Sequence, residues 1–112
     1  KEAYIAADEL QKEGISCEII DLRTVRPMDH KTILDSVKKT NRLVILEEAW
    51  PFGNVATEIT YQVQSQAFDY LDAPIIKINT ADTPAPYSPV LLKEWLPNSG
   101  DVVAAVKKVL YK

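Results

Sequence analysis

The stretch RLVILEE, residues 42–48, decides how this chain is expected to fold. Its four aliphatic side chains form an unbroken run with no polar face, which is typical of a strand covered by helices on both sides. A second apolar segment, residues 75–79 (IIKIN), begins directly after Pro74. We therefore expect residues 43–46 and 75–79 to form strands of a buried parallel sheet.

Segments with helical periodicity alternate with these strands. Apolar residues recur at helical spacing over residues 2–13, from Asp29 to Lys39, and over residues 55–67, and a short helical turn is expected over 91–96. Asp29 is expected to cap the second helix and Gly14 to end the first in the left-handed conformation. Asp101 is expected to cap a closing helix that contains Val102, Val106, Val109 and Leu110.

A further strand is expected over residues 16–22, whose apolar side chains occupy both faces of an extended chain. It contains Cys17, the single cysteine, which we expect to be a buried thiol in a reducing compartment because no intrachain disulfide can form. A catalytic Cys17 would need a histidine partner, and the sequence suggests none beside it.

The alternation of helices and short strands predicts an α/β fold, a three-layer α/β/α sandwich with a mostly parallel open sheet. We expect one domain over residues 1–112. The chain opens on a helix with no preceding strand, so we expect a fragment that lacks its first strand through truncation. Strands near Cys17 and Leu43 would then pair directly or leave unsatisfied amides, which favours self-association.

Composition excludes several classes of function. The 16 acidic and 13 basic residues are interspersed and give a net charge of -3, so we expect no nucleic-acid partner. No apolar run approaches the ~20 residues that cross a bilayer, so we expect no membrane partner. The glycines, Gly14, Gly53 and Gly100, lie far apart, and we expect no phosphate or cofactor site in this chain.

Three regions remain as candidate sites. His30, the only histidine, has no second ligand at metal-binding spacing and is expected to be a solvated surface residue. Glu47 and Glu48 follow a strand at its carboxyl end, where open α/β sheets bind ligands, although solvated strand ends or a subunit interface also explain them. The loops 50–52 and 84–89, the second with Tyr87, are either recognition surfaces or plain packing.

Several short motifs spread over the whole chain form a specific pattern. They are, in order, residues 12–15 (KEGI), 21–29 (DLRTVRPMD), 39–42 (KTNR), 47–51 (EEAWP), 71–74 (LDAP), 81–87 (ADTPAPY) and 96–98 (LPN). Together they resemble the C-terminal domain of the β subunits of thiamine-diphosphate-dependent 2-oxo-acid dehydrogenases. Residues 50–51 and 95–98 favour the pyruvate type over the branched-chain type.

This resemblance implies that the chain is one domain of a larger, multisubunit enzyme. The parent reaction is the oxidative decarboxylation of pyruvate with thiamine diphosphate and magnesium, held by the α subunit and the N-terminal domain of β, so the chain alone is expected to be inactive. The implied partners are the α subunit, a second β subunit of a heterotetramer, and the dihydrolipoyl acyltransferase core. The implied compartment is the bacterial cytoplasm, or else the mitochondrial matrix. A self-contained α/β domain that binds a small ligand is the alternative.

The resemblance also implies a partner-binding site. In the family, an acidic residue in the turn before the last strand and the terminal carboxylate hold the basic subunit-binding domain of the acyltransferase. The matching positions are Asp72, before Pro74, and Lys112, whose own positive side chain opposes a basic partner. A solvated turn residue is the alternative for Asp72.

Overall fold

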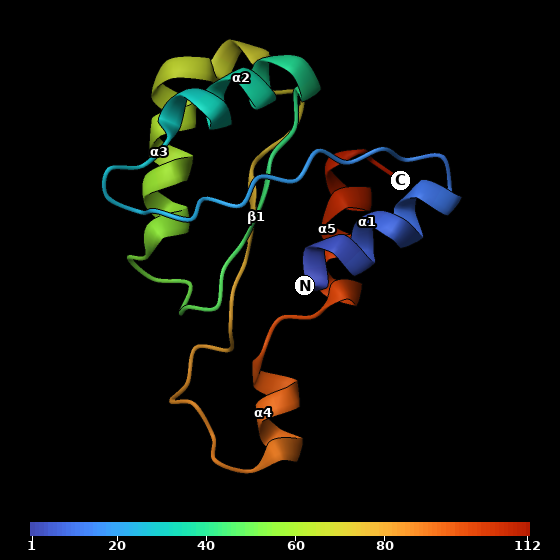
Figure 1. Cartoon of the computed structure of the whole chain (residues 1–112), viewed down its shortest axis with the longest axis vertical. Coiled ribbons are helices and arrows are strands. Elements are labelled where there is room, and N and C mark those ends of the chain that lie inside the picture. Colours follow the sequence, from blue (N-terminus) through green and yellow to red (C-terminus); the bar gives the residue numbers. More distant parts are fainter.

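A computed structural model describes all residues from 1 to 112, and helices dominate it (Figure 1). The elements are, in order, α1 (Glu2–Lys12), α2 (His30–Thr40), β1 (Val44–Leu46), α3 (Val55–Ala67), the 3₁₀ turn η1 (Phe68–Tyr70), β2 (Ile76–Ile78), α4 (Pro89–Trp95) and α5 (Ser99–Val109). Helices and strands therefore alternate over most of the chain, as the periodicity predicts.

The sheet consists of two parallel strands, β1 and β2, paired in the register Val44 to Ile76 and Leu46 to Ile78. Both strands fall inside the segments expected from their aliphatic runs. Because the strands are parallel, both begin at one end of the molecule and both finish at the other. The loops before the strands are thereby separated from the loops after them.

Helices cover the two faces of this sheet. In Figure 1, α2 and α3 lie on one side of the strands, and α1 and α5 lie on the other. The α2–α3 side contains a buried cluster of Ile33, Val37, Ile45, Ala56, Ile59, Val63 and Ala67. The α1–α5 side contains a second cluster of Ala6, Ile78, Val102 and Ala105. The expected order of layers, helix, sheet and helix, is confirmed with a sheet of two strands.

The segment 16–22 is not a strand, and that prediction is wrong. None of its backbone N–H groups donates to a backbone carbonyl, so it runs extended without a hydrogen-bonded neighbour. It is held against α2 through Glu18, which accepts a hydrogen bond from the Ser36 hydroxyl at 2.8 Å. Apolar side chains make a strand only where a second strand satisfies its backbone. Cys17 is accordingly half-buried rather than buried.

The helix ends follow the expected capping chemistry, with one correction. Asp29 accepts a hydrogen bond from the Thr32 N–H at 3.1 Å, and Gly14 has a φ of +80° after α1. The cap of α5 is Asn98, not Asp101. Asp101 is instead the third helical residue of a capping box, where its carboxylate accepts from the Asn98 N–H at 3.0 Å.

Leu10 offers a direct test of the packing between α1 and α5. Its side chain has no exposed surface, and α1 packs along α5. Leu10→Ala is expected to lower the free energy of unfolding by about 2 to 5 kcal/mol, because it leaves a cavity. The same change at Leu91, which is 54% exposed on α4, should cost far less. Urea unfolding of both variants measures the difference, and equal losses would contradict this packing.

The two-stranded sheet also predicts association. Each strand has one edge without a partner, and the extended backbone of 16–22 is equally unpaired. Unpaired edges favour pairing with another chain. Sedimentation at increasing concentration is expected to show dimers or larger species, and a monomer throughout would be evidence against open edges in solution.

Candidate functional site

Candidate functional residues gather at the two opposite ends of the sheet. Asp72 precedes β2, so it lies at the end where both strands begin. Glu47 and Glu48 follow β1, so they lie at the end where both strands finish.

The turn that carries Asp72 is fixed to the end of α2. The Asp72 N–H donates to the Asn41 carbonyl at 2.8 Å, and the Asn41 side-chain amide donates to the Tyr70 carbonyl at 2.9 Å. Asn41 ends α2 in the left-handed conformation, with a φ of +65°. The backbone of the turn is therefore anchored, while the Asp72 side chain remains 57% exposed.

The end of α5 reaches this turn. The Tyr111 hydroxyl donates a hydrogen bond to the Asp72 carbonyl at 3.3 Å, and the Lys112 N–H donates to the Lys107 carbonyl at 2.9 Å. The fold therefore places Tyr111, the neighbour of Lys112, against the Asp72 turn. Asp72 is thus in contact with the residue that precedes Lys112.

Arg42 is a charged neighbour of Asp72 that was not predicted from the sequence. Its Nη1 lies 3.8 Å from Asp72 Oδ2, and its Nε donates to the Val109 carbonyl at 3.0 Å. Both residues are partly exposed, so the pair adds little stability. Its consequence is electrostatic, because a guanidinium beside Asp72 offsets part of the carboxylate's charge. The sequence could have indicated this contact, because Arg42 lies just before β1 and Asp72 just before β2, at the same end of a parallel sheet.

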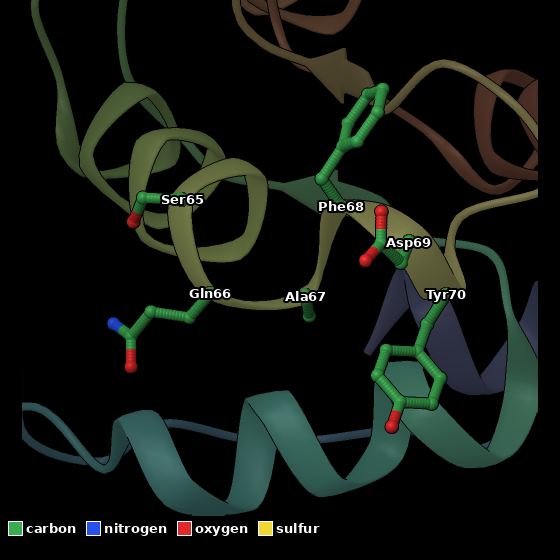
Figure 2. Close-up of a pocket in the computed structure, with 6 residues that line it drawn as sticks. All are labelled: Ser65, Gln66, Ala67, Phe68, Asp69 and Tyr70. Carbon is green, nitrogen blue, oxygen red and sulfur yellow. The ribbon is translucent and has the colours of Figure 1, made fainter.

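A hollow of about 210 Å³ is lined by residues that precede Asp72 in the chain (Figure 2). Its lining is one continuous stretch, residues 65–70, at the end of α3 and in η1. The Tyr70 ring points toward α2, where the Lys38 ammonium lies 5.6 Å from the ring centroid. Separate elements do not converge here, so the hollow lacks the several polar groups from different directions that mark a ligand site.

At the other end of the sheet, Glu47 is a structural residue. One carboxylate oxygen accepts from the Ala56 N–H in the first turn of α3 at 3.0 Å, and the other accepts from the Asn79 amide at 2.7 Å. A carboxylate at a helix N-terminus is stabilised by the unpaired N–H groups there. Glu47 thus links β1, α3 and the end of β2, and both its oxygens are used.

Glu48 has a different environment. It forms no hydrogen bond and no ion pair, and it lines an open hollow of about 310 Å³ with Ala49, Trp50, Asn54, Ala85 and Trp95. We call this the tryptophan hollow. The paired-carboxylate reading of Glu47 and Glu48 is therefore not supported, because only one of the two is free to meet a ligand.

The loops around the tryptophan hollow meet at the Thr83 carbonyl. The indole N–H groups of Trp50 and Trp95 both donate to the Thr83 carbonyl, each at 2.9 Å. The Asn54 side-chain amide holds the same region by donating to the Trp50 carbonyl at 2.6 Å. Phe52 and Tyr87 nevertheless stay in solvent, at 88% and 103% exposure. The aromatic loops are thus packed at their base and exposed at their tips.

The other candidates offer little chemistry. His30 is the first residue of α2 and is half-buried, more enclosed than expected, yet its ring forms no hydrogen bond. Burial raises the pKa of the Cys17 thiol, which makes it a poorer nucleophile at neutral pH. No helix is both long and apolar enough to cross a bilayer.

The donor set of this chain does not fit thiamine diphosphate with magnesium. No three histidine, cysteine or carboxylate side chains come together in a group that could hold a metal ion. Gly14 ends α1, Gly53 lies before α3, and Gly100 lies inside α5, so no glycine-rich turn cradles a diphosphate.

Comparison with known proteins gives concordant matches. The family model "Transketolase, C-terminal domain" matches residues 1–102. The pyruvate dehydrogenase E1 component subunit beta of Rhizobium meliloti is 58% identical over 110 residues, which are 98% of this chain and 24% of that protein. The same-named subunit of Rickettsia felis is 53% identical over 111 residues, 99% of this chain and 34% of that protein.

A relative from a plant is also similar to this chain. The mitochondrial pyruvate dehydrogenase E1 component subunit beta-2 of Oryza sativa is 48% identical over 110 residues, 98% of this chain and 29% of its own length. The chain thus spans between about a quarter and a third of these relatives. The resemblance seen in the sequence motifs is confirmed, and the chain belongs to the transketolase C-terminal domain family.

Proposed function

We propose that residues 1–112 are a single domain, the C-terminal domain of the β subunit of a pyruvate dehydrogenase E1 component. The observation that carries the proposal is similarity over nearly the whole chain to β subunits of that name, at 48% to 58% identity. All three relatives described above are of the pyruvate type, which favours pyruvate over a branched-chain 2-oxo acid as the parent enzyme's substrate.

In this proposal the parent enzyme oxidatively decarboxylates pyruvate, and this domain contributes assembly and docking. Thiamine diphosphate and magnesium bind elsewhere in the parent, and the isolated chain is inactive. No group of metal-ligating side chains comes together in this chain, which supports binding of the cofactor in another part of the parent enzyme. The α subunit and a second β subunit are the assembly partners, and the exposed aromatic side chains of Phe52 and Tyr87 are the kind of surface that a subunit would cover.

Docking to the dihydrolipoyl acyltransferase core is proposed at Asp72 and the carboxylate of Lys112. A basic subunit-binding domain would gain a charge-assisted hydrogen bond from Asp72. The anchored turn supports the proposal, because the Asp72 backbone is already ordered by Asn41 and Tyr111 before a partner arrives. Arg42 and the Lys112 side chain oppose the attraction and limit its strength.

The proposed compartment is the bacterial cytoplasm. Two of the relatives come from bacteria, and the plant relative carries a mitochondrial name, so the matrix is the corresponding compartment in a eukaryote. The unpaired Cys17 thiol is compatible with either reducing environment.

Asp72 is the residue to change first. In the full β subunit, Asp72→Ala is expected to weaken binding of the acyltransferase's subunit-binding domain by about 1 to 3 kcal/mol, the loss of one hydrogen bond to a charged group. Decarboxylation with an artificial electron acceptor should be unaffected. Calorimetry at low salt measures the affinity, where such pairs are least screened.

The matched control is Asp8→Asn, which removes a carboxylate on the exposed face of α1. It should leave the affinity unchanged. If Asp72→Ala and Asp8→Asn bind the subunit-binding domain equally well, Asp72 is not the docking residue.

The absence of cofactor binding has its own test. A ligand that binds only the native state raises the melting temperature. For the 112-residue chain, saturating thiamine diphosphate with magnesium is expected to leave the melting temperature unchanged, as measured by differential scanning calorimetry. A saturable rise would instead favour a self-contained ligand-binding domain.

A further inference from the structure

The tryptophan hollow is assembled from separate parts of the chain. Glu48 and Trp50 come from the segment after β1, Asn54 from the start of α3, Ala85 from the proline-rich loop, and Trp95 from the end of α4. Its volume of about 310 Å³ is at the lower limit of ligand pockets. Convergence of separate elements distinguishes it from the hollow of residues 65–70.

The two indoles offer this hollow aromatic carbon rather than hydrogen-bond donors. Both N–H groups are already donated to the Thr83 carbonyl. Only the ring atoms remain for a ligand. An aromatic ring attracts a cation through its negative face, most strongly when the ring is that of tryptophan.

Glu48 provides the only charged group among the residues that line the hollow. Unlike Glu47, it has no hydrogen bond within the chain, so its full acceptor capacity is open. The ammonium of Lys77 in β2 is engaged elsewhere, because it donates to the Pro51 carbonyl at 2.7 Å and to the Thr57 hydroxyl at 3.1 Å. The hollow therefore combines a free carboxylate with two aromatic rings.

That combination selects a cation with an extended, weakly hydrated surface. A guanidinium fits it better than an ammonium, because it is planar, stacks on aromatic rings and donates two parallel hydrogen bonds to a carboxylate. The surroundings favour a cation attached to a protein. Phe52 and Tyr87, whose loops also supply lining residues, are almost wholly exposed. A small free cation would leave them in water, whereas a protein surface would cover them.

We propose that the tryptophan hollow receives an arginine side chain from a different protein, not from a second copy of this chain, with the guanidinium between Trp50 and Trp95 and hydrogen-bonded to Glu48. Phe52 and Tyr87 then pack against apolar residues beside that arginine. This site lies at the end of the sheet opposite Asp72, so it stands or fails independently of the docking site proposed there.

The chain provides its own reporters for a test. It contains two tryptophans, and both line the hollow. Their indole N–H signals in the ¹⁵N-labelled chain therefore report on this hollow and on the Thr83 carbonyl that both groups contact. The probe is a blocked peptide with a central arginine between leucines, and its control has citrulline, the uncharged analogue of arginine, at the centre.

The arginine peptide is expected to shift both indole signals saturably, and the citrulline peptide to bind about tenfold more weakly or worse, the order expected for a lost charge-assisted contact. Glu48→Gln keeps the side-chain shape and should weaken the arginine peptide by a similar factor of about ten. The matched control, Glu9→Gln on the exposed side of α1, should bind like the unaltered chain.

Four results of the binding measurements would overturn the proposal. They are unshifted indole signals at saturating peptide, equal binding of the citrulline peptide, unchanged affinity in Glu48→Gln, and tetramethylammonium binding as tightly as the peptide, which would mark a site for a free cation. Indole signals that move with chain concentration alone would show that a second copy covers the hollow, and would overturn it as well. The citrulline comparison uses the unaltered chain, so it stands even if a variant folds poorly.

Discussion

The parallel pairing of β1 with β2 is the constraint on which the rest of this structure depends. Three residues of each strand pair, and such a short ladder would not be stable alone. It persists because α2 and α3 bury one face and α1 and α5 the other, each with its own apolar cluster. The pairing in turn fixes which loops meet. It brings Asn41, Arg42 and Asp72 to one end, and Glu47, Trp50 and Asn79 to the other.

The parts of the fold that sequence predicts well are those with a local cause. The predicted third helix, with Val55, Ile59, Val63 and Ala67 on one face, is confirmed as α3. Asp29 caps α2 through its own side chain, three residues from its partner. The prediction for residues 16–22 is wrong because strand formation depends on a distant partner, which local apolar spacing cannot reveal.

At the candidate sites, too, local features were predictable from the sequence and tertiary contacts were not. The resemblance indicated Asp72, yet the cation of Arg42 beside it is a tertiary contact between the start of β1 and the turn before β2. Glu47 and Glu48 are indistinguishable as sequence. β1 ends at Leu46, and the chain bends at Glu48, so the two side chains leave the strand end in different surroundings. One of them consequently meets α3 and Asn79, whereas the other faces the tryptophan hollow.

The junction at the Thr83 carbonyl has an implication for how this region can vary. The indole N–H groups of Trp50 and Trp95 both donate to the main-chain oxygen of residue 83. These two hydrogen bonds do not involve the side chain of residue 83. Residue 83 can therefore be replaced by other residue types that tolerate the local backbone conformation. A substitution of either tryptophan, in contrast, removes one of the two hydrogen-bond donors. Substitutions would thus be tolerated at residue 83 and not at Trp50 or Trp95, although residue 83 supplies the oxygen that both indoles contact.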